Sequence, residues 1–551
     1  MSTTEALPAS GFLARERTIA NPGFSRWLVP PAALAIHLCI GMAYGFSVFW
    51  LPLSKAIGIT ESVECPADIS FFGRLFSSTC DWKLYMLGWT YTLFFVFLGS
   101  AAAIWGGWLE RAGPRKAGVV AAVCWCGGLV ISASGVFLHQ LWMLWLGSGV
   151  IGGIGLGLGY ISPVSTLIKW FPDRRGMATG MAIMGFGGGA MIGAPLADRL
   201  MKFYATPASV GVWETFLTLA AIYFAFMMAG ALSYRVPPDG WRPAKWDPSQ
   251  VKAKKLVTDK HVLLSVAWRT PQFWLLWGVL TLNVSAGIGI LGMASPLLQE
   301  VFGGRLIGVS ATIDQLTAAQ KTQIAAIAAG FTGLLSLFNI GGRIFWASLS
   351  DRLGRKATYA VFFLLGIALY SSIPWTAATV NLALFVAFFC VALSMYGGGF
   401  ATVPAYLADL FGTRMVGAIH GRLLTAWSTA GVLGPVLVNY IRDYQIDHGV
   451  ARAQAYSLTM FILAGLLALG FICNLLIKPV NPKNYMTPLQ IAADDKALKA
   501  KNGDQPAAPL PSSGAGEAQA TWLVPAAWLA VWIPLGWGIW VTLQKAVLLF
   551  K

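Results

Sequence analysis

The sequence predicts an all-α polytopic membrane protein, built from two six-helix bundles as parallel repeats with an extra C-terminal transmembrane helix. Of the 551 residues, 56% are hydrophobic and 11% are charged, whereas a soluble domain carries about 25% charged residues. Apolar runs of about 20 residues, long enough to cross a bilayer as helices, recur along the chain. A duplicated charged motif relates the two halves.

This motif occurs twice, each time between two hydrophobic runs. The copies read GGWLERAGPRKAG at 106–118 and GRIFWASLSDRLGRK at 342–356. Aligning Glu110 with Asp351 gives an offset of 241 residues, and the segments that start at Ser162 and Ala401 align at offsets of 240 or 241. Two copies in the same orientation predict a parallel repeat of six helices.

The apolar runs place twelve spans in the two bundles and a thirteenth beyond them. They lie near 27–53, 84–106, 118–138, 141–168, 176–198 and 213–234, then near 273–299, 323–346, 357–375, 381–408, 416–440 and 453–477, and finally near 521–544. The fourth and fifth spans are rich in glycine, which allows close helix packing. They do not match a phosphate-binding loop, because no strand precedes them and no Lys-Ser/Thr follows.

The segments outside the spans divide the chain. We expect a cytoplasmic N-terminal segment (1–26), a first bundle (27–234), a basic cytoplasmic linker (235–271), a second bundle (272–478), a disordered polar tail (479–520) and the thirteenth helix (521–551). The low hydrophobicity of the tail is typical of disorder. The alternative for 521–551 is a helix that lies in the membrane interface, but its apolar length favours spanning.

The distribution of basic residues predicts the orientation. The formal net charge is +16, which could indicate a nucleic-acid partner. However, 26 of the 39 Lys and Arg residues fall in the segments on one side of the spans, and 9 fall in the loops on the other. This bias follows the positive-inside rule. We therefore expect a multi-pass protein of the cell inner membrane, with a cytoplasmic N-terminus and no nucleic-acid partner.

Helices 1 to 12 resemble the major facilitator superfamily, because the repeated charged motif is typical of its 2–3 and 8–9 loops. The first copy departs from the family pattern, with Glu110 in place of Asp and Pro114 in place of a basic residue. Within the superfamily the chain most resembles the oxalate/formate antiporter family and its monocarboxylate-transporting relatives. The segments GMAYGFSVFWLPL, GRIFWASLSDRLGRK and GRLLTAWSTAGVLGP carry this resemblance.

The resemblance implies a secondary active transporter of small carboxylates that works by alternating access, and not an enzyme. Its partners would be the lipid bilayer, a small organic anion and either protons or a counter-anion. No cofactor or metal is implied, and we expect a monomer. An exporter of drugs or other organic molecules is the alternative on the same scaffold.

Arg343 is the main candidate for binding the anion. It lies eight residues before Asp351, which places it roughly 12 Å into the membrane. A charge there costs at least about 2.5 kcal/mol, and a guanidinium matches a carboxylate in a bidentate manner. Snorkelling to the interface is the alternative. In the family that this chain resembles, an Arg at this place on helix 8 binds the substrate carboxylate.

Helix 11 bears on the charge of the substrate. The resembled antiporters also use a Lys there, and oxalate is a dianion, but this chain has Trp427 at the matching position. One deep cation suits one carboxylate, so pyruvate, lactate or formate is favoured, with oxalate/formate-type exchange as the alternative. His420 and Arg422 could supply further charge or could line the cytoplasmic mouth.

Aromatic and titratable residues complete the expected pathway. Tyr44, Tyr160 and Trp427 lie at depths where the resembled fold lines its pore, although helix packing would also explain them. Tyr396 and Asn283 are weaker candidates. His37 could titrate, but a lone membrane histidine can also be a packing residue. The sequence therefore leaves symport and exchange open.

Two further groups of residues have predicted roles outside the central pathway. The charged residues Glu110, Arg111, Asp351 and Arg352 are expected to gate the cytoplasmic side, or to act only as topology determinants. In the first external loop, Cys65 and Cys80 are either a disulfide or two free thiols.

Overall fold

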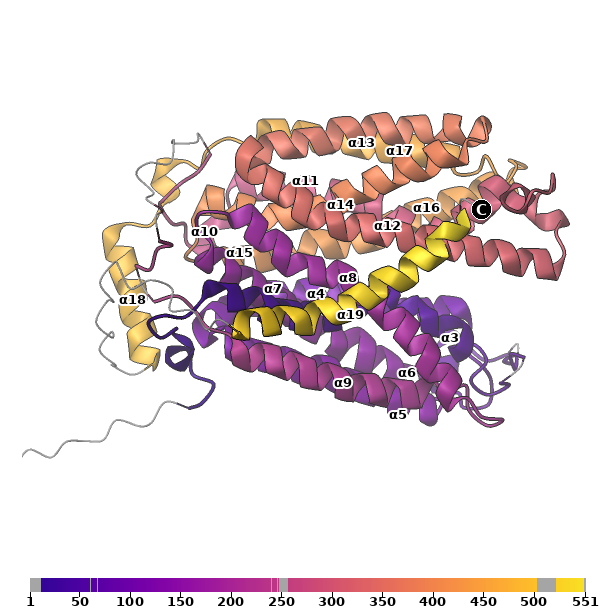
Figure 1. The fold of residues 1–551 in the computed structure, drawn as a ribbon, viewed down its shortest axis with the longest axis horizontal. Helices are drawn as coiled ribbons and strands as arrows, with labels where there is room; N and C mark the ends of the chain where they lie inside the picture. Colours follow the sequence, from indigo (N-terminus) through magenta and orange to yellow (C-terminus); the bar gives the residue numbers. More distant parts are fainter. Residues whose placement is uncertain are drawn as a thin grey trace, which may run out of the picture.

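The chain folds into long helices that run side by side through one elongated body. The computed structural model describes residues 11–59, 61–66, 68–238, 240–244, 246, 256–502 and 522–549. In these ranges, thirteen helices are long and apolar enough to cross a membrane. Figure 1 shows the first half of the chain beside the second half, with each half forming its own group of helices. The predicted all-helical class with a thirteenth long helix is confirmed.

The first bundle contains six long segments, two of which combine several helical types. The first segment runs from α1 (Val29–Ile40) through a 3-10 stretch (Gly41–Phe49) into α2 (Trp50–Leu53). The fourth runs from α6 (Leu141–Leu144) through a π-helical stretch (Trp145–Gly152) into α7 (Gly153–Trp170). The other four are α4 (Leu84–Ala112), α5 (Pro114–Phe137), α8 (Arg175–Tyr204) and α9 (Val212–Ser233). The short α3 (Phe71–Phe76) lies in the loop before α4.

The second bundle repeats this order after a linker that contains the short α10 (Leu264–Ala267). Its helices are α11 (Pro271–Phe302), α12 (Ala318–Leu353), α13 (Arg355–Ala378), α14 (Leu382–Phe411), α15 (Val416–Leu423) followed directly by α16 (Thr425–Asp447), and α17 (Ser457–Leu476). Helices satisfy every backbone polar group within the segment, which is why long apolar runs adopt them in lipid.

The two charged motifs form matching helix junctions. Gly113 separates α4 from α5 with φ +85°, and Gly354 separates α12 from α13 with φ +88°. These glycines are 241 residues apart, and a side chain would be strained at either backbone conformation. We call the end of the molecule where these junctions lie the basic end. Each junction fixes an acidic residue at the end of the preceding helix.

Several spans depart from regular α-helical geometry. The first span changes to 3-10 geometry over Gly41–Phe49, and the fourth changes to π geometry over Trp145–Gly152. Pro163 and Pro404 occupy matching places inside α7 and α14. Membrane helices tolerate such residues where neighbouring helices cover the freed backbone groups.

Part of the 479–520 tail, which we expect from its composition to be disordered, is helical in the structure. Residues Pro488–Asn502 form α18, and Arg414 holds this helix through ion pairs of 2.8 Å to Asp494 and 2.5 Å to Asp495. The backbone N–H of Met486 also donates to the carbonyl of His261 in the linker. Ion pairing at the basic end thus compensates for the low hydrophobicity of this segment. Residues 503–520 of the predicted tail, like 1–10 and 247–255, lie outside the described ranges.

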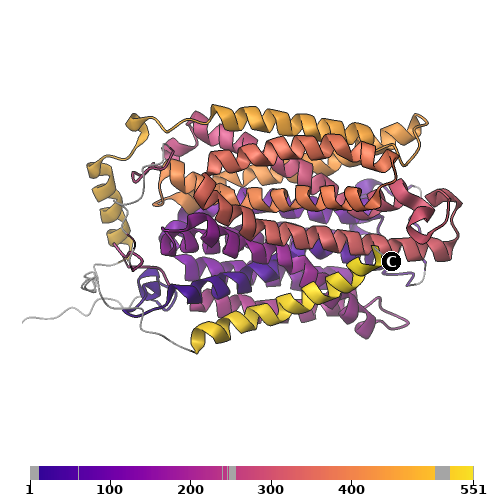
Figure 2. The same cartoon turned by 45° about the horizontal axis from the view of Figure 1, so that its top comes forward.

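The thirteenth long helix, α19 (Leu523–Ala546), crosses the outside of the two bundles diagonally (Figures 1 and 2). Trp528 donates its indole N–H to the carbonyl of Trp27 at 3.1 Å, beside α1. Further along, Gly538 packs on α8, while Thr542 packs on Gly333 of α12. The helix therefore contacts both halves of the repeat.

Candidate functional site

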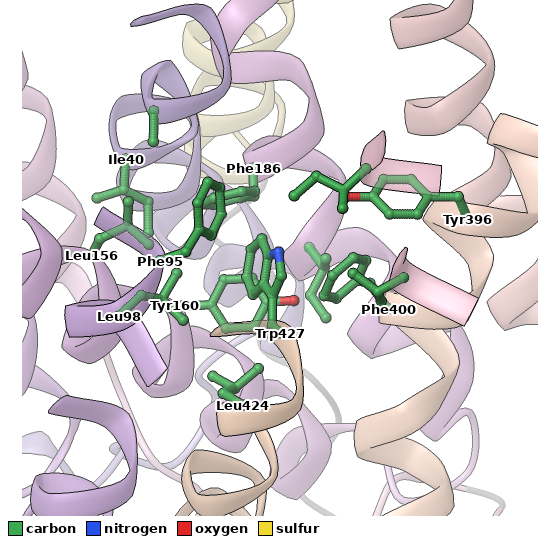
Figure 3. Close-up of a cluster of buried hydrophobic side chains, with 14 of the residues drawn as sticks. Ile40, Phe95, Leu98, Leu156, Tyr160, Phe186, Tyr396, Phe400, Leu424 and Trp427 are labelled. Carbon is green, nitrogen blue, oxygen red and sulfur yellow. The ribbon is translucent and has the colours of Figure 1, made fainter. Parts of the chain in front are cut away.

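Aromatic side chains fill the centre of the molecule, where the bundles meet. Figure 3 shows Trp427 among Tyr160, Phe186 and Phe400. The Trp427 ring centroid lies 4.4 Å from that of Phe400, 5.2 Å from that of Phe186 and 5.3 Å from that of Tyr160. Tyr160 and Phe186 come from α7 and α8 of the first bundle, whereas Phe400 and Trp427 come from α14 and α16 of the second. The cluster therefore spans the seam between the bundles.

Two tyrosines link the bundles at the same level. The hydroxyls of Tyr44, from the 3-10 stretch of the first span, and Tyr396, from α14, are hydrogen-bonded at 3.0 Å. The Tyr44 ring packs edge-on against Phe186, with 5.0 Å between centroids. The structure thus brings Tyr44, Tyr160 and Trp427 together. Sequence reasoning missed Phe186 and Phe400, because phenylalanine in an apolar helix carries no polar signal that separates a site from packing.

Arg343 lies beside this cluster and is fully buried, with 0% of its surface exposed. Its Nε donates to Asn339 Oδ1 at 3.1 Å, one helical turn earlier on α12. Its Nη1 donates across the seam to the carbonyl of Ile183 in α8 at 2.9 Å. The guanidinium carbon lies 5.9 Å from the ring centre of Phe186 and 5.7 Å from that of Phe400. These contacts hold one side of the guanidinium, while Nη2 has no hydrogen-bond partner.

Other buried polar atoms near the cluster also lack hydrogen-bond partners. They are the Tyr160 hydroxyl, the Trp427 indole N–H and both ring nitrogens of His420. The His420 ring centroid lies 5.9 Å from that of Tyr160. Buried polar groups are nearly always paired in proteins, so each unpaired group calls for an explanation. Hydroxyl and N–H donors beside a buried cation can bind an anion that has a small apolar body.

Arg422 does not join this group. Its guanidinium donates to the carbonyl of Leu264 at 3.2 Å and lies 5.5 Å from the ring centre of Trp268. Both partners belong to the segment just before α11. Arg422 therefore faces the linker side of helix 11, and we leave it out of the proposed substrate site.

At the basic end, the acidic residues of the two motifs cap helices of the opposite bundle. Glu110, at the end of α4, accepts the backbone N–H of Gly417 in α15 at 2.9 Å. Asp351, at the end of α12, accepts the backbone N–H of Gly176 in α8 at 2.9 Å, and that of Met177 at 3.0 Å. Gly176 and Gly417 are 241 residues apart, like the two acids. A carboxylate at a helix N-terminus is favoured by the helix dipole.

Basic side chains complete these two contacts, which we call the Glu110 clasp and the Asp351 clasp. Lys169 pairs with Glu110 at 2.7 Å. Arg355 pairs with Asp351 at 2.6 Å and with Asp409 at 3.2 Å. Asp409 also pairs with Arg175 across the seam at 3.2 Å.

Several members of the clasps carry only a weak signal in the sequence. Arg355 lies within the second motif, but its repeat position holds Pro114, so the comparison of the two halves does not draw attention to it. The predicted gate residues Arg111 and Arg352 are exposed on the surface. We therefore assign the inter-bundle contacts to Glu110, to Asp351 and to the Arg175–Asp409 pair, while Lys169 and Arg355 support the acids from within their own bundles.

Cys65 and Cys80 form a disulfide at the end opposite the clasps. His139, which follows α5, stacks on Trp82 with 4.2 Å between ring centroids and contacts the carbonyl of Cys80 at 2.9 Å. Burial lowers the pKa of His139 below its usual value. Across the described residues, no group of three or more His, Cys, Asp or Glu side chains is arranged to hold a metal ion.

Several named proteins are similar to the chain in sequence, among them an antiporter and a pyruvate carrier. It is 30% identical to the oxalate:formate antiporter of Oxalobacter formigenes over 52% of this chain and 59% of that protein. It is 28% identical to apicoplast pyruvate carrier 1 of Toxoplasma gondii over 53% of this chain and 58% of that protein. The matched part thus spans about three fifths of each relative.

A solved structure and a family model place the fold. The proton:xylose symporter XylE superimposes with a TM-score of 0.55 at 16% identity, over 81% of this chain and 94% of that protein. The model of the Major Facilitator Superfamily matches residues 33–435, and also residues 315–549. The chain therefore belongs to the Major Facilitator Superfamily.

Proposed function

We propose that this protein is a secondary active transporter of small monocarboxylates, such as pyruvate, lactate or formate, and that it works by alternating access. The observation that carries the proposal is the Arg343 guanidinium, which is fully buried at the seam with Nη2 unpaired. The names of the relatives, an oxalate:formate antiporter and a pyruvate carrier, support carboxylate as the substrate class.

The geometry suggests how the substrate would be held. A carboxylate would take Nη2 of Arg343 as its ionic partner, while Nε and Nη1 stay fixed by Asn339 and Ile183. The Tyr160 hydroxyl and the Trp427 indole N–H supply further unpaired donors. Hydrogen bonds that involve an ionised group are roughly twice as strong as neutral ones. The surrounding rings would exclude water and pack on the short apolar body of the anion.

The charge of the site favours a monoanion. Arg343 is the permanent cation among the described residues of the cluster, and Trp427 stands where the resembled antiporters place a Lys. His420 supports a second candidate function, the exchange of a dicarboxylate such as oxalate. Its imidazole is buried near Tyr160 without a hydrogen-bond partner, so its protonated form could face a second carboxylate.

The clasps support the alternating-access part of the proposal. We propose that bundles 27–234 and 272–478 rock against each other as a monomer, with the basic end facing the cytoplasm in the cell inner membrane. In this structure the Glu110 and Asp351 clasps hold the basic end together. Release of both clasps would open the site towards the cytoplasm.

Uptake into proteoliposomes tests the proposal. We expect labelled pyruvate, lactate or formate to enter, and Arg343→Gln to lower uptake by about 10- to 100-fold, which corresponds to the loss of a hydrogen bond to a charged group. Arg422→Gln is the matched control, because Arg422 faces the linker, and should stay within about twofold of the unsubstituted protein.

Two results would contradict the assignment. Equal uptake by the Arg343→Gln variant would remove Arg343 from the site and favour an exporter of other organic molecules. Oxalate exchange that exceeds pyruvate uptake, and that is abolished by His420→Gln, would favour the dicarboxylate candidate.

A further inference from the structure

His37 is a buried titratable residue that the proposed substrate site does not use. It lies in α1 with 0% of its surface exposed. Its Nδ1 contacts the backbone carbonyl oxygen of Ala182 in α8. Its Nε2 lies 3.2 Å from the backbone carbonyl oxygen of Tyr160 in α7. Both ring nitrogens therefore face hydrogen-bond acceptors that belong to two other helices.

The two acceptors bear on the protonation state of the ring. A neutral imidazole has one N–H donor and one lone pair, whereas an imidazolium has two N–H donors. Because a carbonyl oxygen can only accept, the neutral ring satisfies one of the two contacts and places a lone pair against the other. The protonated ring satisfies both. The two carbonyls thus provide a hydrogen-bond acceptor for each N–H of a protonated His37 ring.

His37 is connected to the anion site through a single turn of α8. Its partner carbonyl is that of Ala182, and the next carbonyl along the chain, that of Ile183, accepts from Nη1 of Arg343. On the other side, the Tyr160 ring lies 5.3 Å from the His37 ring, and its hydroxyl is one of the unpaired donors of the site. A rearrangement at Arg343 therefore reaches His37 through one peptide unit.

Burial of His37 is the main obstacle to its protonation, and the charge of Arg343 adds to it while the site holds no anion. Arg343 of α12 acts on it as a like charge, Tyr160 of α7 presents a neutral phenol, and α8 presents backbone carbonyls. None of the described carboxylates pairs with His37 or Arg343. Two cations without an anion are costly in a low-dielectric interior. A bound carboxylate would offset the charge of Arg343 and place a negative charge in the same buried region, which lowers the cost of a second cation there.

We propose that His37 is the proton-binding site of the transporter, and that it takes up one proton when a monocarboxylate binds at Arg343. The inference rests on the proposed function and specifies its coupling as proton symport. The proton adds to the lone pair of the unprotonated ring nitrogen, and no covalent bond between heavy atoms changes. The site carries one positive charge when empty and one when loaded, so the two bundles would rock with the same net charge in both states.

Transport with and without a proton gradient tests the proposal. The His37→Gln variant is compared with the unsubstituted protein and with a control variant, His448→Gln. His448 is an exposed histidine at the end of α16. We expect His37→Gln to keep pyruvate counterflow within about threefold and to lose accumulation driven by an inward proton gradient. Accumulation at the unsubstituted level by His37→Gln would overturn the proposal.

A second measurement applies if His37→Gln is inactive in both assays. The chain has five histidines, so 15N-histidine NMR of the unsubstituted protein is tractable, and the His37→Gln spectrum assigns the His37 signals. Saturating pyruvate at pH 7 should change these signals from the neutral to the imidazolium pattern. Signals that stay neutral with pyruvate bound would overturn the proposal. Absence of pyruvate counterflow in the unsubstituted protein would instead contradict the proposed function itself.

Discussion

The Glu110 clasp and the Asp351 clasp are two copies of one device that have diverged in their side chains. In each, an acid at a helix end accepts a backbone N–H from a glycine of the opposite bundle, and these four positions follow the 241-residue repeat. Asp351 accepts two backbone N–H groups and Glu110 accepts one. The backbone geometry has thus persisted while the number of supporting contacts has not.

The surrounding charges widen this difference. Arg355, with 8% of its side chain exposed, joins Asp351 to Asp409, which reaches Arg175 across the seam. In the other clasp, Lys169 pairs with Glu110 alone and is 27% exposed. A more exposed pair contributes less, because water screens it. We infer that the Glu110 clasp opens first when the bundles rock, and that the Asp351 clasp sets the stability of the closed basic end.

Removing the basic partner of each clasp should have the largest and most unequal effect. Arg355→Gln leaves Asp351 and Asp409 without their shared counter-charge and close to each other. Loss of a partner from a buried ion pair costs up to about 3 kcal/mol. Because both ion pairs of Arg355 lie within the second bundle, the closed population falls only by the share of this cost that is specific to the closed state, where Asp351 and Asp409 also contact the first bundle. Lys169→Gln should cost less than about 1 kcal/mol, because its ion pair is partly exposed.

Electron paramagnetic resonance distances can measure this population. Spin labels at Lys116 and Leu353, exposed residues of the two bundles at the basic end, would report the opening, in a background where Cys124 and Cys473 are replaced by Ser. If the distribution of spin-label distances broadened equally towards long distances in Arg355→Gln and Lys169→Gln, the proposed difference between the clasps would be contradicted.

A methyl group on each clasp glycine should distinguish the two clasps sterically. A Cβ at position 176 would overlap the backbone carbonyl oxygen of Ala347, whereas a Cβ at position 417 would overlap the carboxylate of Glu110 and approach Ser165. A side-chain carboxylate can move aside, but a backbone carbonyl inside a helix cannot. Gly176→Ala should therefore cost about 1–3 kcal/mol of the closed state, and Gly417→Ala should cost less.

The same labels, together with pyruvate uptake, would check the glycine substitutions. We expect the long-distance population to rise about tenfold or more in Gly176→Ala, with slower uptake. If Gly417→Ala opened the basic end further than Gly176→Ala, the Glu110 clasp would be the less adaptable of the two.

Neutralising each acid should give a smaller difference in the same direction. Asp351→Asn keeps an acceptor oxygen but removes its charge from two backbone N–H groups and from Arg355, and should cost about 1–2 kcal/mol. Glu110→Gln weakens one backbone contact and one partly exposed ion pair, and should cost less than about 1 kcal/mol. Thermal unfolding in detergent, with the spin-label distances, would separate loss of the clasp from loss of the fold.

The sequence predicted the repeat, the helices and part of the site for definite physical reasons. Spacing of 240 or 241 residues fixed the correspondence of Glu110 with Asp351, and helix rise placed Arg343 deep in the bilayer. Neither rule gives the direction of a side chain around a helix. For this reason the sequence left open whether Arg422 supplies charge to the substrate or lines the cytoplasmic mouth, and the structure places it against Leu264 and Trp268.

Contacts between distant segments were the part that the sequence could not give. Composition predicted that 479–520 is disordered, yet Arg414 pairs with Asp494 and Asp495 of α18 at a distance of about eighty residues along the chain. Likewise, nothing in the sequence pattern shows that the carbonyls of Ala182 and Tyr160 face His37. These contacts follow from how the helices pack, which a single sequence without its fold does not specify.

The smallest expected effect is a pH dependence on the Asp351 side, where the linker histidine His261 lies near the clasp. Burial lowers the pKa of His261 below its usual 6.5, and the charges of Arg414 and Arg175 lower it further. Because Arg175 belongs to the first bundle, its charge opposes protonation of His261 in the closed form, and we expect the closed form to bind this proton less readily than the open form. The neutral histidine therefore favours the closed end above pH 6.5. That stabilisation is lost as the pH falls through the lowered pKa. Between pH 7.5 and 5.5 the spin-label distances should therefore shift modestly towards the open form, and His261→Gln should remove the shift. A shift that persists in His261→Gln would show that another group titrates. If Glu110→Gln shows the same pH-dependent shift as the unsubstituted protein, the shift does not depend on the Glu110 clasp.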